Sequence, residues 1–350
     1  MQGVRIFFTS WKSRFFPKKY KGSAEEICRQ IVEECWNGRY FQTSTGNFAQ
    51  FWARDFGWCT ASLLKLGYNE KVKQTLRYAV NRYKKANKIT TTLTPKGKAF
   101  DFPTYAVDSI PWLIHSMRLS KFNYYDHKEF LNKEIRKFYE KVVDPSTGLV
   151  KKGHFSSMKD HTVRNSSCYD NSMVAMLAND LKNMKLFNPF KGDNSKLLED
   201  KFWNGKYFED DLDKGDYIAG DANIFPFLCG GIKDEEKLRS CIKYIQAAFL
   251  DDPFPLKYTQ NREGINFISE EIFARDYESN AIWMHMGPLY VKLVKEVDLG
   301  LYEKYEKQYT NLIEHHQNYL EVFNKEGKPY SSPFYYCDSG MLWACNYLTL

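Results

Sequence analysis

The stretch ARDFGWCTASLL, residues 53–64, places a charged pair before an apolar run with an aromatic residue near its start. Five later segments repeat this arrangement: VDSIPWLIHSM (107–117), YDNSMVAMLA (169–178), GDANIFPFL (220–228), SNAIWMHMGPLYV (279–291) and CDSGMLWACNYL (337–348). Their leading polar residues stand 53, 62, 51, 59 and 58 residues apart and are Asp55, Asp108, Asp170, Asp221, Asn280 and Asp338. Self-similarity of this order is typical of a repeat architecture.

Each interval is long enough for two helices and their connections, so the repeat predicts six helical hairpins. We expect a single all-α domain in which the hairpins close into a double ring, an (α/α)6 barrel. The polar residue that opens each inner helix would then lie at one end of the ring. The predicted helices span 23–36, 55–66, 69–86, 107–119, 126–141, 170–184, 194–204, 221–229, 234–248, 280–296, 300–322 and 338–349.

The predicted outer helices carry charge, whereas the inner ones are apolar nearly all round, as expected for a buried ring. Ser23 followed by Glu26 forms a capping-box pattern at the first helix. Long connections at 87–106, 142–169 and 251–279 all precede inner helices, so we expect them at the same end of the ring. TTTLT and KAFDF in the first of them alternate like the strands of a β-hairpin. Long loops in a compact domain are usually functional.

The charge pattern divides the chain into a basic N-terminal arm at 1–22 and a barrel domain at 23–350. The net charge of +7 is spread out, and its densest basic stretch lies between Lys12 and Lys21. We expect a solvated arm there, because no nucleic-acid motif or amphipathic helix accompanies it. No run approaches the ~20 apolar residues that span a bilayer. The eight Cys form no CxxC pair, which favours reduced thiols and a cytoplasmic protein. From the missing motifs and apolar runs we expect no nucleic-acid or membrane partner.

The motif inventory points to carboxylate chemistry. HExxH, P-loop, GxGxxG and GxSxG motifs are absent, and the seven His show no metal-ligand spacing. We therefore expect no cofactor and no metal. A pocket that gathers Asp, Glu, Arg and Trp suits a carbohydrate substrate and glycoside hydrolysis by a general acid and a general base.

Five segments resemble known glycosidases, in the same order along nearly the whole chain. FWARDF (51–56) resembles an element of the alkaline/neutral invertases and glycogen-debranching glucosidases, and GLVKKGHFSSMKD (148–160) resembles a loop of the same proteins. RNSSCYDNSM (164–173) is similar to a segment of the trehalases and processing α-glucosidases, glycoside hydrolase families 37 and 63. SNAIWMHMGPLYV (279–291) and residues 319–348 resemble the later motifs of these families. The resemblance implies an inverting hydrolase of an α-linked glucoside.

The resemblance also implies the catalytic carboxyls. Glu321, predicted near the end of a helix, is the general-base candidate, and Glu326 is its rival in an exposed turn. The general acid is Asp160 by the invertase-like motif or Asp170 by the trehalase-like motif. A helix start lowers the pKa of a carboxyl, whereas a general acid needs a raised one, so Asp160 is favoured over Asp170. An inverting enzyme would hold its two carboxyls ~6.5–9.5 Å apart.

The substrate-binding candidates lie at or beside the inner-helix starts. Arg54 and Asp55 resemble the sugar-clamping pair of the family, although an internal ion pair that caps the helix is an equal alternative. Trp residues 52, 58, 112, 283 and 343 recur near the helix starts, and one or two of them would form a stacking floor. The full set is Trp52, Arg54, Asp55, Trp58, Asp108, Asp221, Asn223, Trp283, His285 and Tyr336.

Two other classes of function fit the same fold, because a fold alone does not determine chemistry. A sugar epimerase would need a His pair that faces the pocket, for which His115 and His285 are the candidates. A non-catalytic carbohydrate-binding relative would keep the cavity without a working acid.

Overall fold

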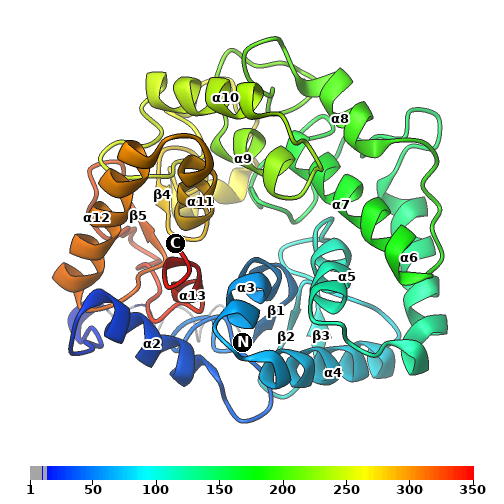
Figure 1. Ribbon diagram of the computed structural model, residues 1–350, viewed down its shortest axis with the longest axis horizontal. Coiled ribbons are helices and arrows are strands. Elements are labelled where there is room, and N and C mark those ends of the chain that lie inside the picture. The colour runs from blue at the N-terminus through cyan, green and yellow to red at the C-terminus, as the bar shows by residue number, and fades with distance from the viewer. Residues whose placement is uncertain (1–9, 11–13) are drawn as a thin grey trace.

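The inner helices of the protein form a closed ring. The computed structural model describes residue 10 and residues 14–350, and Figure 1 views it along the ring axis. Each inner helix contacts the next, and the last contacts the first. The described inner helices are α3 (Ala53–Lys65), α5 (Ser109–Leu119), α7 (Cys168–Met184), α9 (Gly220–Leu228), α11 (Gly287–Val297) and α13 (Ala344–Tyr347). The predicted (α/α)6 barrel is therefore confirmed.

A second layer of helices surrounds this ring (Figure 1). Its helices are amphipathic: in the first, Ile27, Ile31 and Val32 are buried while Glu25 and Arg29 are exposed. The predicted Ser23–Glu26 capping box is present there. The outer helices are α2 (Ala24–Cys35), α4 (Asn69–Ala86), α6 (Lys128–Val142, after the 3-10 turn η1, Tyr125–His127), α8 (Asn194–Phe202), α10 (Glu235–Ala247) and α12 (Leu299–His316).

Short antiparallel strands line one end of the ring. β1 (Phe51–Trp52) pairs with β2 (Thr92–Leu93), and β2 pairs with β3 (Ala99–Phe100), which confirms the hairpin predicted within 87–106. β4 (Ile282–Trp283) pairs with β5 (Val322–Phe323).

The two longest connections are also joined to each other. Thr162 pairs with Phe267 in an antiparallel bridge, flanked by hydrogen bonds from Val163 N to Asn266 O and from Ile268 N to His161 O, both 2.9 Å. The second connection also contains the 3-10 helix η2 (Ser269–Ala274).

The fifth and sixth inner helices begin later than predicted. Asn280 lies in the turn before β4, and the fifth helix begins at Gly287, where Pro288 suits a first-turn position. Asp338 opens no helix, because its carboxylate accepts hydrogen bonds from Ser44 Oγ and from the Asn47 and Phe48 backbone N–H groups. The last inner helix is a single turn from Ala344, after Gly340 at φ 64°.

The predicted helix 300–322 ends at His316, because Gln317 adopts a left-handed conformation at φ 50°. Glu321 therefore lies directly before β5, and its predicted position near the end of a helix is wrong.

The described part of the basic arm lies against the barrel. Tyr20 N donates to Gln317 O, Asn318 Nδ2 donates to Lys18 O, and Arg14 donates to Ser331. Residues 1–9 and 11–13 of the predicted arm lie outside the described residues. Within the described chain, no helix combines the length and apolar character that crossing a bilayer requires.

Candidate active site

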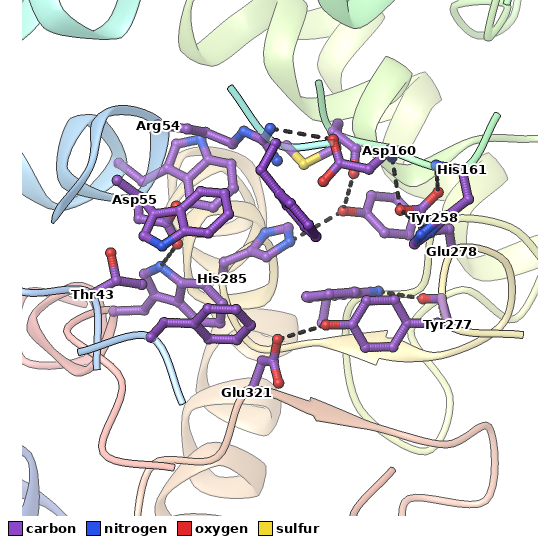
Figure 2. Close-up of a pocket in the computed structure, with 17 residues that line it drawn as sticks. Thr43, Arg54, Asp55, Asp160, His161, Tyr258, Tyr277, Glu278, His285 and Glu321 are labelled. Atoms are coloured by element: carbon purple, nitrogen blue, oxygen red, sulfur yellow. Dashed lines mark hydrogen bonds and ion pairs between the residues drawn. The ribbon is translucent and has the colours of Figure 1, made fainter. Parts of the chain in front are cut away.

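A pocket opens at the end of the ring where the long connections and short strands meet. It encloses about 660 Å³ of space, including open solvent at its mouth. Figure 2 shows its side chains converging from several hairpins. The lining is rich in aromatic rings and carboxyls: Thr43, Phe48, Trp52, Arg54, Asp55, Trp58, Phe102, Met158, Asp160, His161, Tyr258, Tyr277, Glu278, Trp283, His285, Glu321 and Trp343.

Glu321 forms one wall of the pocket and is only 2% exposed. Its Oε1 accepts a hydrogen bond of 2.6 Å from Tyr277, and its Oε2 accepts from Tyr335 and from the Asp338 N–H. Burial, with the nearby Asp338, raises the pKa of Glu321 to about 7 despite these donors. A carboxyl that titrates near neutrality and is held by three donors suits proton transfer.

Asp160 lies across the pocket from Glu321, as Figure 2 shows. Its Oδ1 accepts from Ser156 Oγ at 2.8 Å and Ser157 N at 3.0 Å, and its side chain is 21% exposed. Oδ2 has no hydrogen-bond partner in the described chain. Burial raises the pKa of Asp160 and Glu278 adds to this, while Arg54 opposes it. The structure thus gives Asp160 an available oxygen that faces the cavity.

Arg54 and Asp55 make separate contacts, so the alternative of an ion pair between them does not hold. Arg54 Nε lies 2.7 Å from Asp108 Oδ2, and its Nη2 lies 3.5 Å from Asp160 Oδ1. Asp55 Oδ1 accepts from Trp343 Nε1 at 3.1 Å. Burial raises the pKa of Asp55 to about 7, although Arg54 lowers it. Asp108 itself does not line the pocket and supports Arg54 from behind.

Aromatic rings close the inner end of the pocket. His285 stacks on Trp58, with ring centroids 4.4 Å apart, and meets Trp343 edge to face at 5.1 Å. Trp52 and Trp283 also line the cavity. Trp112, the remaining predicted stacking candidate, instead donates to Tyr169 OH within the core.

Three ring nitrogens in this aromatic wall are buried without a hydrogen-bond partner in the described chain: Trp52 Nε1, Trp58 Nε1 and His285 Nδ1. Tyr258 donates to Met158 O, so it accepts from His285 Nε2. This leaves His285 Nδ1 as an acceptor, and burial holds the pKa of His285 well below its ordinary value. Two donors and one acceptor without partners match the needs of a polyhydroxylated ligand.

Three of the pocket residues that sequence reasoning missed carry polar side chains in the long connections: His161, Tyr277 and Glu278. Glu278 Oε1 accepts from Asp160 N at 2.7 Å and from the His161 ring at 3.0 Å, and its Oε2 accepts from His161 N at 2.6 Å. Although burial disfavours the charged imidazole, Glu278 raises the pKa of His161 to about 9. All three residues lie in the long connections. The length of these connections was the sequence feature that indicated a functional role for them.

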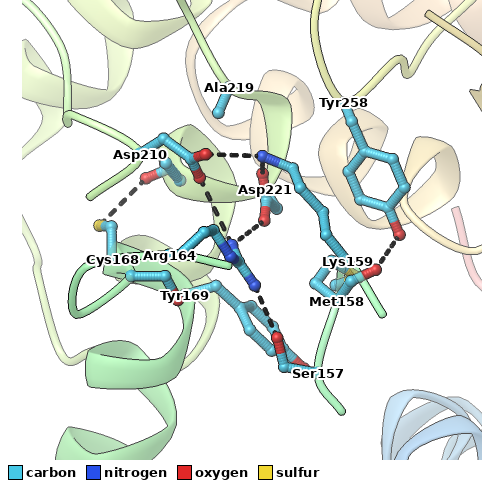
Figure 3. A network of polar contacts seen from close by, with 12 residues as sticks. Ser157, Met158, Lys159, Arg164, Cys168, Tyr169, Asp210, Ala219, Asp221 and Tyr258 are labelled. Carbon is cyan, nitrogen blue, oxygen red and sulfur yellow. Dashed lines mark hydrogen bonds and ion pairs between the residues drawn. The ribbon is translucent and has the colours of Figure 1, made fainter. Parts of the chain in front are cut away.

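A buried charge network lies behind the pocket wall (Figure 3). Lys159 Nζ stands 2.9 Å from Asp210 and 3.4 Å from Asp221, and Arg164 Nη1 stands 3.4 and 3.2 Å from the same two residues. Arg164 Nη2 also donates to Ser157 Oγ at 2.6 Å. Asp221, predicted to bind substrate, is fully buried in this network and does not line the pocket.

Asp170 also lies outside the pocket lining. Ser167 is the N-cap of its helix and accepts a hydrogen bond from Asp170 N, so Asp170 lies inside the first turn. Asp170 Oδ1 is buried without a partner in the described chain, and burial raises the pKa of this carboxyl, although Arg164 lowers it.

Three further candidates lie away from the cavity. Asn223 bonds the backbone of Phe208, Tyr336 is half-buried beside Ser10, and His115 contacts Asp180 near the opposite end of its helix. In the described chain, no cluster of three or more His, Cys, Asp or Glu is arranged to hold a metal ion.

Comparisons with known proteins find similar proteins by structure alone. The chain matches no family model, and no curated protein matches its sequence. The GH63 mannosylglycerate hydrolase from Thermus thermophilus is similar with a TM-score of 0.64 and 10% identity, covering 93% of this chain and 98% of that one.

Two rhamnosidases share the fold as well. The enzyme from Klebsiella oxytoca has a TM-score of 0.61 and 7% identity over 95% of this chain, which spans 65% of that protein. The GH78 family rhamnosidase of Bacillus SP. GL1 has a TM-score of 0.62 and 12% identity, covering 93% of this chain and 34% of its own. At these identities the likeness establishes the barrel fold.

Proposed function

We propose that the protein is a glycoside hydrolase with Asp160 as general acid and Glu321 as general base. The observation that carries this proposal is the presence of two carboxyls on opposite sides of one aromatic-lined pocket. Hydrolysis of a glycosidic bond needs one carboxyl to protonate the leaving oxygen and a second to act on the far face of the sugar. Solved structures named as glycosidases share the fold, which supports the same class.

The two walls suit the two roles. Asp160 presents a cavity-facing oxygen, so it can donate its proton to the leaving group. Glu321 is held by Tyr277 and Tyr335 with its pKa about 7, so its ionised form can take a proton from water. Trp58, Arg54 and Asp55 also line the pocket.

An α-linked, gluco-configured substrate and inversion at the anomeric carbon are the finer parts of the proposal. They rest on the ordered resemblance of the motifs to invertases, trehalases and processing glucosidases. The opposed positions of Asp160 and Glu321 are compatible with a water molecule between base and sugar.

Charge in the pocket favours an uncharged sugar over an anionic one. Four carboxyl residues line the cavity: Asp55, Asp160, Glu278 and Glu321. The two lining cations, Arg54 and His161, already face Asp108 and Glu278. An anionic sugar would therefore find no unpaired cation among the described lining residues.

A screen of α-linked disaccharides and aryl glycosides tests the proposal, with the product anomer followed by NMR. We expect release of one neutral hexose with inverted configuration, and much weaker cleavage of matched uronides. A product with retained anomeric configuration would overturn the inverting mechanism but would leave the assignment as a glycoside hydrolase intact. Binding of the sugars without turnover would favour a non-catalytic carbohydrate-binding protein.

A sugar epimerase is the second candidate, because His161 and His285 both line the pocket. His161 is paired to Glu278 and would be protonated at neutral pH, whereas His285 would be neutral. Incubation of free hexoses in D2O separates the two classes, since an epimerase exchanges a carbon-bound hydrogen and a hydrolase does not.

A further inference from the structure

Two consecutive residues contact the opposite walls of the pocket. Tyr277 donates to Glu321 Oε1 at 2.6 Å, and Glu278 accepts from the Asp160 backbone N–H at 2.7 Å. Figure 2 shows the Tyr277 side chain directed at the Glu321 carboxyl and the Glu278 side chain directed at Asp160 and His161. We propose that Tyr277 and Glu278 form a bridge that positions the proposed base and the proposed acid relative to each other.

The bridge is fixed at its acid end by more than one contact. Both carboxylate oxygens of Glu278 are occupied by the Asp160 and His161 N–H groups and the His161 ring. Glu278 is 3% exposed, so this carboxylate serves to hold the chain and is not free for proton transfer. The pairing of Thr162 with Phe267 joins the same two connections.

The bridge is equally fixed at its base end. Tyr277 packs against Trp283, Tyr330 and Tyr335, with centroids 4.5, 5.2 and 5.7 Å apart. Trp283 Nε1 also donates to the Tyr277 carbonyl at 2.8 Å. Adjacent Cα atoms are about 3.8 Å apart. A rigid dipeptide that contacts Glu321 with one residue and the Asp160 backbone with the next therefore restricts the distance between the two carboxyls. That separation distinguishes inverting from retaining glycosidases.

The electrostatic effects of the two residues have opposite signs. Burial and the nearby Asp338 raise the pKa of Glu321. Tyr277 donates to the ionised form of Glu321 and therefore lowers this pKa, as Tyr335 does. Glu278 raises the pKa of Asp160, whereas Arg54 and His161 lower it. Arg54 is itself paired with Asp108. Removing the Tyr277 hydroxyl should raise the pKa of Glu321, and neutralising Glu278 should lower that of Asp160.

The inference rests on the proposed function for its catalytic meaning, so the main readout does not require turnover. Carboxyl ¹³C NMR titrations of the whole protein would follow Asp160 and Glu321, assigned with Asp160→Asn and Glu321→Gln. We expect Tyr277→Phe to raise only the Glu321 pKa and Glu278→Gln to lower only the Asp160 pKa. Hydrogen exchange should also show faster exchange at the amides of residues 160 and 161 in Glu278→Gln.

Matched controls come from the same region. Tyr330→Phe removes a hydroxyl that donates to Arg275 O, and Glu271→Gln neutralises a buried carboxylate that pairs with Arg262. Neither should move either carboxyl titration.

Where hydrolysis is detected, the Tyr277→Phe/Glu278→Gln double variant should lose about 10²-fold in kcat, as expected for a ~1 Å misplacement. The pH–rate profile of this double variant should be narrower, because the Glu321 pKa rises at its acidic limb and the Asp160 pKa falls at its basic limb. Unchanged titrations of both carboxyls would overturn the bridge, even if the amides exchanged faster. Shifted titrations in a protein that cleaves no glycoside would keep the bridge and reject the proposed function.

Discussion

Lys159 and Asp160 are neighbours in sequence, yet their side chains enter two different environments. Lys159 is fully buried and faces Asp210 and Asp221, whereas Asp160 faces the cavity with one oxygen free of partners in the described chain. The network behind the wall satisfies its charges internally, and the pocket does not. Residue type alone therefore does not identify a site; the environment that the fold gives each side chain must be known as well.

The largest effect should separate the two regions by activity. Glu321→Gln and Asp160→Asn should each lower kcat by ~10²–10⁴-fold, the usual contribution of a general acid or base, with little loss of thermal stability. Asp221→Asn should instead lower stability. Steady-state kinetics with thermal denaturation checks this, and Glu326→Gln, in an exposed turn, is the unaffected control. Full activity in Glu321→Gln would remove the proposed mechanism.

Stability should separate the two regions in the opposite sense. Lys159→Met removes one of the two cations that face Asp210 and Asp221 in the described chain, and breaking a buried ion pair costs ~3–5 kcal/mol. Lys152→Met removes an exposed pair with Asp213 from the same connection and should cost at most ~1 kcal/mol. Urea denaturation would measure both. Equal losses would show that the network is no more important to the fold than a surface ion pair.

The pH dependence of turnover should expose the pocket carboxyls. Glu321 must be ionised to act as a base, and burial raises its pKa to about 7. Activity should therefore fall about tenfold per pH unit below that value, because each unit protonates ten times more of the base. A pH–rate profile of kcat/KM on a neutral glycoside tests this. A profile flat down to pH 5 would argue against Glu321.

A smaller effect should appear in the pH dependence of stability. The folded pKa of His161 is about 9, above its unfolded value of ~6.5. The pairing with Glu278 therefore stabilises the fold fully below pH ~6.5, and this contribution is lost as pH rises through about 9. The stability difference between wild type and His161→Gln should shrink over that interval in denaturant titrations. A constant difference would contradict the charged pairing.

The parts of this molecule that follow a local pattern could be predicted from sequence. The six apolar runs indicated the ring, and Glu321, Asp160, Arg54, Asp55 and several Trp residues were expected in the pocket that they line. The local sequence pattern gave a wrong prediction where a residue distant in sequence determines the conformation. Asp338 resembles a helix start, but its carboxylate binds the turn at Ser44–Phe48, almost 300 residues away.

The same limit applies to the missed pocket residues. Glu278 meets Asp160 across 118 residues of sequence through irregular backbone, so no periodicity marks the contact. Asp221 has the spacing of a site residue, yet Lys159 and Arg164 neutralise it inside the core. Sequence spacing places a residue at the correct end of the ring without specifying which partner it meets there.

The aromatic closure of the pocket has a consequence for the order of events. Trp58, His285 and Trp343 are each less than 5% exposed and close the inner end. If the glycone occupies this inner end, the leaving group lies toward the mouth and must depart before the sugar can follow. We therefore expect trimming of one unit at a time from a chain terminus, with the released sugar as a competitive product inhibitor and internal bonds of long polymers left intact.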